Sequence, residues 1–258
     1  DITIPDSVES VGSSTFYGCS ALTSCTFPYN TKVSVQSDTF TDCDVLKTVF
    51  LPNVPNGISG ATTNIPSKPA KIYYTKDAKS VTIDQVLGGE QTSIEIPETI
   101  GKAAVKTIGD SSFNGCKVKS IKLPTSVTSI GSEAFMNCSD LTEINIPNGV
   151  QSIGASAFFN CVQLVKLELP QSITSIGRSA FYGCEYLKTI NIPDNVTKIE
   201  TGTFYGCRNL TSINIPSKVT DIGTAAFREC SQLKAIDIPD SVESIGSEAF
   251  EFCYGLTS

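Results

Sequence analysis

The chain contains 258 residues, of which 40% are hydrophobic, and its formal net charge is -7 without a single histidine. This acidic balance argues against nucleic acid or an anionic membrane surface as a partner, because both are bound by basic side chains. The absence of histidine removes the commonest general base and the commonest metal ligand. No long apolar run occurs, so we expect no segment that inserts into a membrane.

One sequence pattern recurs along most of the chain. It reads Leu-x-x-Ile-x-Ile-Pro-x-x-Val-x-x-Ile-Gly-x-x-Ala-Phe-x-x-Cys, and its clearest copy covers residues 164–184. Its phenylalanine occurs as Phe16, Phe40, Phe113, Phe135, Phe158, Phe181, Phe204, Phe227 and Phe250. Its cysteine follows as Cys19, Cys43, Cys116, Cys138, Cys161, Cys184, Cys207, Cys230 and Cys253. From Pro124 to Pro239 the proline returns every 23 residues. Such a fixed period predicts a solenoid of stacked repeats.

Each repeat is predicted to contain two short extended stretches and a turn. In residues 144–146 isoleucine alternates with asparagine, which is the period of a strand, and residues 150–153 start a second stretch. Gly154 then allows a bend that a side chain would obstruct. Residues 157–161 return the chain as a single helical or 3₁₀ turn. Glycine or asparagine before the cysteine suits the left-handed backbone that ends such a turn, at Gly18, Gly115, Asn137, Asn160, Gly183 and Gly206. The predicted fold class is an α/β repeat solenoid, mostly β and loops, with short helical turns.

Residues 53–93 depart from the pattern. Counting 23 residues from Pro52 reaches Thr75, at the end of the strand-like Ile72–Thr75, and 22 more reach Pro97. The length fits two degenerate repeats, so we favour one continuous solenoid made of 1–52, 53–93 and 94–258. The alternative ends one array at Ile72–Thr75 and starts a second with residues 81–96, with a flexible joint between them. Both chain ends lie inside repeats, so we expect a fragment of a longer protein.

Residues 210–230, LTSINIPSKVTDIGTAAFREC, and their sister copies resemble the BspA-like leucine-rich repeats, a family of bacterial and protist surface proteins. The resemblance covers most of the chain apart from residues 53–93. It implies a right-handed leucine-rich-repeat array with a parallel β-sheet on its concave face. It also implies a secreted or cell-surface protein that binds host or partner proteins. The family has no shared catalytic motif, so the resemblance supplies no active-site residue.

All ten cysteines occupy predicted core positions, because nine stand in one column and Cys25 replaces the first isoleucine of its strand. Neighbouring cysteines of the column would have parallel Cβ vectors, which disfavours disulfides. No CxxC pair occurs, so the sequence does not indicate zinc or redox chemistry. We expect buried free thiols, no metal and no cofactor.

No enzymatic activity is predicted. The serines and threonines have no histidine to activate them as nucleophiles. Glu143 and Glu168 lie on adjacent predicted strands, but they are better explained as polar surface than as the carboxylate pair of a glycosidase.

The outward-facing column of the first strand is one candidate binding surface. It consists of Thr3, Thr26, Phe50, Tyr73, Glu95, Lys122, Asn145, Glu168, Asn191, Asn214 and Asp237. From Asn145 onward it is an amide and acidic strip suited to hydrogen-bonding a protein or glycan. The alternative is a merely solvated strip in which Asn191 and Asn214 pair with each other.

The residue after each repeated phenylalanine gives a second candidate surface. Phe159, Tyr182 and Tyr205 stand on three consecutive repeats, with Arg178 and Arg208 near them in the sequence. Tyrosine and arginine are enriched at binding hot spots. The alternative is that the rings are partly buried against the next repeat, with their hydroxyls in water.

Asn195 and Asn209 begin N-glycosylation sequons, which would be used only in a eukaryotic secretory pathway. A third sequon, at Asn137, is expected to be less accessible.

The sequence as a whole favours a non-enzymatic binding or adhesion module, extracellular or on the cell surface. Its partner would be a protein or glycan, including extracellular matrix, and nucleic acid is not expected. One alternative is a structural spacer or fibre with mainly self-association contacts. Another is an intracellular scaffold, which would suit the free thiols.

Overall fold

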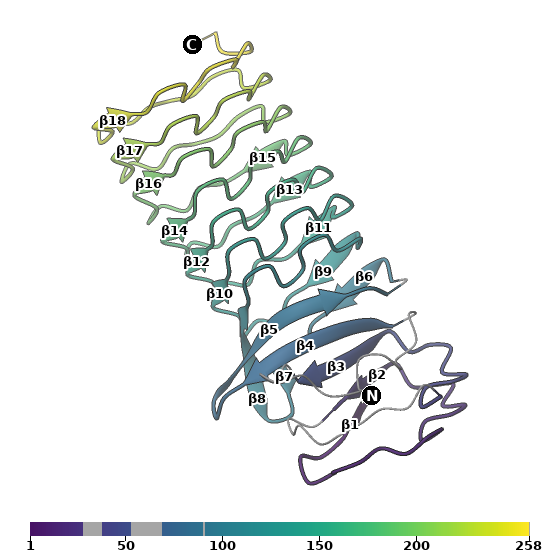
Figure 1. Ribbon diagram of the computed structural model, residues 1–258. Helices are drawn as coiled ribbons and strands as arrows, with labels where there is room; N and C mark the ends of the chain where they lie inside the picture. Colours follow the sequence, from purple (N-terminus) through teal and green to yellow (C-terminus); the bar gives the residue numbers. More distant parts are fainter. Residues whose placement is uncertain (28–37, 53–68, 90, 258) are drawn as a thin grey trace.

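The computed structural model describes residues 1–27, 38–52, 69–89 and 91–257. The chain forms an elongated stack of rungs, with the N-terminal residues at one end and the C-terminus at the other (Figure 1). The described residues contain 18 short strands and no helix.

The strands form four sheets. The largest has ten strands, in the order β1-β2-β3-β4-β5-β8-β10-β12-β14, with β7 beside β8. Its members are β1 (Ile2–Thr3), β2 (Ser24–Thr26), β3 (Thr48–Pro52), β4 (Ala70–Lys76), β5 (Ser80–Leu87), β7 (Thr99–Ile100), β8 (Ala103–Ile108), β10 (Ser129–Ile130), β12 (Ser152–Ile153) and β14 (Ser175–Ile176). The second sheet contains β6 (Ser93–Glu95), β9 (Ser120–Lys122) and β11 (Glu143–Ile144). The third contains β13 (Lys166–Leu167) and β15 (Thr189–Ile190), and the fourth contains β16 (Lys198–Ile199), β17 (Asp221–Ile222) and β18 (Ser244–Ile245).

Apart from β7 and β8, the strands from residue 93 onward stand in two columns, one for each extended stretch of the repeat. The first column is β6, β9, β11, β13 and β15, and the second is β10, β12, β14, β16, β17 and β18. Within a column the strands are parallel and in register: Ile121 pairs with Ile144, and Ile130 with Ile153. The predicted solenoid with stacked parallel strands is therefore confirmed.

The predicted helical turn before each cysteine is instead a pair of tight turns. In one rung the amide of Phe159 donates to the carbonyl of Ser156 at 3.0 Å, and that of Cys161 to Phe158 at 3.1 Å. Ser156, at the start of the first turn, and Asn160, within the second, have positive φ angles of 54° and 56°, which lie outside the range of a right-handed helix. The left-handed conformation predicted before the cysteine is confirmed at all six of its glycine and asparagine positions.

The register of the stack changes between β4 and β8. β4 lies parallel to β3, but β5 runs antiparallel to β4 and then pairs in parallel with β8. The first stretches of the N-terminal repeats therefore share a sheet with the second stretches of the later repeats. An antiparallel pair does not arise when one repeat stacks on the next. Residues 53–68 lie outside the described residues, so the division of 53–93 into two degenerate repeats stays a prediction.

The repeated phenylalanines form the centre of the core. The rings of Phe113, Phe135, Phe158, Phe181, Phe204 and Phe227 have no exposed surface. Neighbouring centroids from Phe113 to Phe250 lie 5.0, 5.1, 5.4, 5.5 or 5.6 Å apart. Each ring in the middle of this ladder therefore packs against the ring of the preceding rung and the ring of the following one.

The repeated glycine has a different role from the predicted bend. Gly154 has no positive φ, but a Cβ placed on it would lie 2.4 Å from the carbonyl carbon of Gly131 and 2.4 Å from the amide nitrogen of Ser132. A Cβ on Gly177 would lie 2.5 Å from the amide nitrogen of Ala155. Glycine is needed here because the backbones of successive rungs approach too closely for any side chain.

Substituting Phe181→Ala should lower the free energy of unfolding by about 3–5 kcal/mol, because it opens a cavity between two stacked rings. Chemical denaturation measures the change. Tyr186→Ala is the control, since Tyr186 is 47% exposed, and it should change stability by less than about 1 kcal/mol. Equal midpoints for Phe181→Ala and the native chain would contradict the ladder.

Substituting Gly177→Ala should destabilise the stack by about 1–3 kcal/mol, because neighbouring backbone must move to admit the methyl group. Gly12→Ala is the matched control, since its nearest new contact would be the Thr15 hydroxyl at 3.6 Å. Thermal unfolding of the two variants should separate them clearly. Similar melting temperatures would show that the rungs are not held as closely as described.

Candidate binding surfaces

The first surface, which we call the strand face, lies over β11, β13 and β15. Two shallow hollows of about 430 and 560 Å³ adjoin here and share Lys166 and Glu168. Asn145 lines one hollow and Asn191 lines the other. The structure therefore brings three of the predicted strip residues together, across three consecutive rungs.

The two asparagines of the strand face are fixed by the backbone of the preceding rung. Asn145 accepts from the Leu123 amide at 2.8 Å and donates to the Leu123 carbonyl at 3.0 Å. Asn191 makes the same two bonds with Leu169, at 2.8 and 2.7 Å. The suggested pairing of Asn191 with Asn214 is not found among the hydrogen bonds of the described residues, because Asn191 bonds with the backbone of the preceding rung instead.

Lys166 and Glu168 form an ion pair at the centre of the strand face. Their charged atoms lie 2.6 Å apart, and the lysine ammonium lowers the pKa of the Glu168 carboxyl by donating to it. Both side chains are mostly exposed, so the pair contributes little to stability. Asn214 and Asp237 are exposed further along the chain and do not line either hollow.

The outward column does not continue into the N-terminal repeats as predicted. Phe50 is only 3% exposed and pairs with Ile72, not with Tyr73. Phe50 and Ile72 belong to the hydrophobic core of the later repeats, whereas Val49 and Leu51 belong to a separate N-terminal core. The outward side of β3 is buried because Phe50 packs in the core of the later repeats.

The second surface, which we call the aromatic stripe, consists of Phe159, Tyr182 and Tyr205. The three half-buried rings stack with centroids 4.5 Å apart at both steps. The Arg228 guanidinium continues the stack, 5.7 Å from the centroid of Tyr205 and 5.3 Å from that of Phe252. The inner rings therefore use their faces on each other, and a ligand could reach only their edges.

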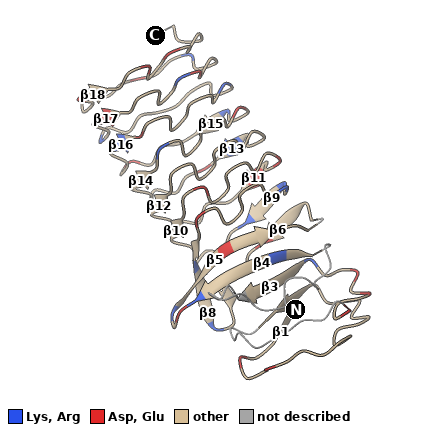
Figure 2. Ribbon diagram, in the orientation of Figure 1, with Lys and Arg blue, Asp and Glu red and all other residues tan. Residues whose placement is uncertain are grey.

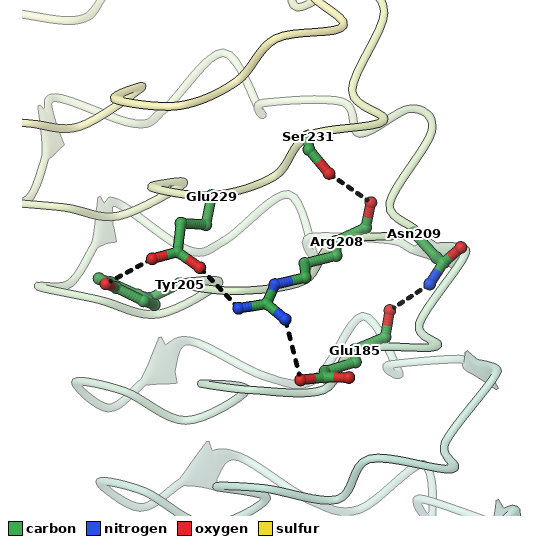
Figure 3. A network of polar contacts seen from close by, with 6 residues as sticks. All are labelled: Glu185, Tyr205, Arg208, Asn209, Glu229 and Ser231. Atoms are coloured by element: carbon green, nitrogen blue, oxygen red, sulfur yellow. Dashed lines mark hydrogen bonds and ion pairs between the residues drawn. The ribbon is translucent and has the colours of Figure 1, made fainter.

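A polar network crosses three rungs beside the stripe (Figure 3). The Tyr205 hydroxyl donates to Glu229 at 2.9 Å, and Arg208 pairs with Glu229 at 2.9 Å and with Glu185 at 3.4 Å. Hydrogen bonds from Arg208 and Tyr205 lower the pKa of the Glu229 carboxyl. Sequence reasoning singled out Tyr205 and Arg208 but missed both glutamates, although Glu185 stands in the same repeat position as Arg208, one rung earlier.

Arg178 does not join the stripe. It lines a separate hollow of about 440 Å³ with Ile176 and Glu200, beside β12 and β14. Arg178 follows the repeated glycine, whereas Tyr182 follows the repeated phenylalanine, so the two side chains belong to different columns of the repeat.

The sequon asparagines differ in their surroundings. Asn195 is exposed and accepts a hydrogen bond from Lys218 at 2.7 Å. Asn209 is half-buried, and its Nδ2 donates to the Glu185 carbonyl at 2.8 Å. Asn195 is therefore the more accessible acceptor of the two.

The cysteines pack in the core as free thiols, with Cys19 alone half-buried. In the ladder the thiol donates to the carbonyl of the phenylalanine in the preceding rung, as from Cys161 to Phe135 at 3.1 Å and from Cys184 to Phe158 at 3.2 Å. Burial raises the pKa of Cys184 to about 12. Cysteine suits this position because it is small and apolar yet supplies a weak donor.

Acidic and basic residues are interspersed along the described rungs (Figure 2). No three His, Cys, Asp or Glu side chains of the described part of the chain are grouped so that they could hold a metal ion. Within the same residues, no helix has the length and apolar character needed to span a membrane.

The stacked parallel rungs define a solenoid of the leucine-rich repeat class. The BspA type leucine rich repeat region matches residues 1–83, 88–199 and 152–258, in 6 copies. The chain belongs to this family, as the sequence resemblance predicted. A search of the curated proteins gives no significant match.

Solved structures of similar chains agree with this assignment. The leucine-rich repeat protein of T. pallidum is 31% identical over 75% of this chain and 91% of its own, with a TM-score of 0.69. A leucine rich cell surface protein of Faecalibacterium prausnitzii is 35% identical over 72% of this chain, with a TM-score of 0.64. This chain's match spans about half, 51%, of the Faecalibacterium chain. The pneumococcal vaccine antigen PcpA shares the fold at 21% identity over 100% of this chain and 65% of its own, with a TM-score of 0.50.

Native protein at pH 8 should expose one reactive thiol to Ellman's reagent, that of Cys19, because the other nine cysteines are buried. Unfolding in guanidinium without reductant should release all ten thiols. The absorbance of the released thiolate gives both counts. A total of eight in denaturant would reveal a disulfide.

Proposed function

We propose that the chain is a non-enzymatic binding module of a cell-surface or secreted protein, and that the strand face engages a protein or glycan. The single observation that carries the proposal is the pair of adjoining hollows in which Asn145 and Asn191 are held by backbone bonds. Amides that are already fixed lose little conformational entropy when a partner binds.

The exposure of the central ion pair supports the same face. Lys166 and Glu168 lie between the two asparagines with most of their surface in water, so they are free to exchange their mutual contact for a partner. Because the face carries hydrogen-bond donors and acceptors and charges of both signs, it suits a polar surface of a partner better than a hydrophobic one. Such a face provides specificity and orientation more than raw affinity.

The similar proteins support the location. The Faecalibacterium protein, 35% identical to this chain, is described as a cell surface protein. A cell-surface or secreted location would bring the strand face into contact with extracellular proteins and glycans. A structural spacer is the competing function, and it would make lateral contacts between copies without requiring the hollows.

Binding of the purified chain to a panel of immobilised extracellular-matrix proteins and glycans tests the proposal by surface plasmon resonance. The double variant Lys166→Ser with Glu168→Ser should weaken binding roughly tenfold or more, because it removes both exposed charges of the face. The matched control is Lys198→Ser with Asp221→Ser. It removes an ion pair between an exposed lysine and a half-buried aspartate, with a distance of 3.4 Å, from the second strand column, and should leave the affinity within about threefold.

Two results would contradict the proposal. Equal losses for both double variants would show that the strand face is not the binding surface. Absence of any partner together with concentration-dependent assembly in light scattering would favour the spacer. Tyr182→Ala with Tyr205→Ala completes the set: unchanged binding would leave the aromatic stripe a packing feature.

A further inference from the structure

The hollow of about 440 Å³ beside β12 and β14, which we call the Arg178 hollow, lies in the middle of the array. Its lining comes from three consecutive rungs and includes the small Ala155, Ser175 and Gly177 as well as the longer Arg178 and Glu200. The strands β17 and β18 follow in the same column, so the stack continues on both sides of the hollow. Its volume falls in the range of about 300–1,000 Å³ that is usual for small-ligand clefts.

Glu200 departs from the repeat at this place. It stands where other rungs carry the repeated glycine, such as Gly177 before it and Gly223 after it. A Cβ on Gly177 would lie 2.5 Å from the amide nitrogen of Ala155, and one on Gly223 would lie 2.6 Å from that of Thr201. Because Glu200 carries a Cβ at this position, its rung cannot approach the preceding rung as closely as the others do.

The second strand column is interrupted at Glu200. β14 ends the ten-stranded sheet and β16 begins the fourth sheet, whereas the other neighbouring strands of the column are paired. The Gly177 amide donates to the Ile153 carbonyl at 2.9 Å, and the Gly223 amide donates to the Ile199 carbonyl at 2.7 Å. Among the described residues, the corresponding bond from the Glu200 amide is absent. A backbone donor beside the hollow is therefore unused.

Arg178 and Glu200 are exposed charges on adjacent rungs. The other two arginines of the chain, Arg208 and Arg228, each pair with two glutamates. In the described part of the chain, neither the Arg178 guanidinium nor the Glu200 carboxylate has an ion pair or a hydrogen bond. Five N–H donors and two carboxylate oxygens are therefore available to a ligand at one hollow.

The two opposite charges favour a ligand that itself carries both charges. An anion would be attracted by Arg178 but repelled by Glu200, and the net charge of -7 also disfavours it. A cation would be repelled by Arg178 in the same way. A molecule with one carboxylate and one ammonium can pair with both side chains. A carboxylate also suits a guanidinium because two parallel N–H···O bonds form between them.

We propose that the Arg178 hollow binds a short peptide through its two free ends. The terminal carboxylate would accept from Arg178, and the terminal ammonium would donate to Glu200. A peptide carbonyl of the ligand is an acceptor for the unused Glu200 amide, and the small Ala155, Ser175 and Gly177 leave room for the ligand backbone. The inference goes beyond the proposed function, because it assigns a second site on the other strand column.

A dipeptide is the smallest probe with the required reach. Neighbouring strands lie about 5 Å apart, and the two Cα atoms of a dipeptide lie about 3.8 Å apart. Its two ends can therefore contact groups on adjacent rungs. Three forms of dialanine separate the two charges: free at both ends, acetylated at the amino end, and amidated at the carboxyl end.

Saturation-transfer NMR on the full chain measures the binding of the three forms. About pH 6.5 keeps the terminal amine protonated, since its pKa is about 7.7–8.0. The free form should bind with a Kd roughly in the millimolar range. Each blocked form should bind about tenfold more weakly or worse, because it loses one of the two charge contacts.

Two variants identify which side chain contacts which end of the peptide. Arg178→Gln should bind the free and amidated forms within about threefold of each other, and Glu200→Gln should do the same for the free and acetylated forms. Both side chains are exposed, so circular dichroism should show unchanged folding. Lys218→Gln is the control, because it removes an exposed positive charge that bonds with Asn195 elsewhere on the chain. It should keep the preference for two free ends.

The proposal is overturned if free dialanine does not bind, or if the blocked forms bind the native chain as well as the free form does. It is also overturned if glucuronate binds while the dipeptide does not, which would assign the hollow to an acidic sugar. The blocked forms test the native chain, so the result does not depend on the folding of a variant. Failure here leaves the strand-face proposal intact, since that depends on Lys166 and Glu168 and is measured separately.

Discussion

The peptide groups of each rung are hydrogen-bonded to the next rung even where the chain forms no strand. In the turn segment the amide of Phe158 donates to the carbonyl of Ala180 at 2.7 Å, and that of Asn160 to Tyr182 at 2.7 Å. Buried peptide groups require such partners. The rungs must therefore approach along their whole contour, which requires glycine at positions such as Gly177 and brings equal positions of successive repeats into stacks.

Most of the scaffold could be predicted from the sequence because the period of the repeat determines which residues stack on one another. The buried Phe181 and Cys184 and the left-handed Asn160 all follow from one repeat laid on the next. The same left-handed position holds Glu229 and Phe252 in later rungs, with φ angles of 60° in both. Neither glutamate nor phenylalanine prefers a left-handed backbone, so packing against the neighbouring rungs imposes this conformation.

The junction could not be predicted because it depends on pairing between distant segments. Ile72 lies in the stretch that the count identified as a strand, but nothing in the period states that β5 turns back on β4. As a consequence, the outward side of Phe50 is covered by the core of the later repeats.

The candidate surfaces were predicted only in part for the same reason. Asn145 and Asn191 could be placed on one face from the period, whereas the Arg208–Glu229 pair joins two different columns of the repeat.

When aromatic residues stack in a ladder, their ring faces cover one another and are not available to a ligand. Tyr182 has a ring neighbour on each side at 4.5 Å, so both faces of its ring pack against neighbouring rings and cannot contact a ligand. A column of repeated side chains is available to a ligand only where a different residue interrupts the repetition. The strand face is an example, because Lys166 stands where the next rung has Thr189, and Glu168 stands where it has Asn191. In a repeat protein, the departures from the repeat are therefore the positions where a partner can be recognised.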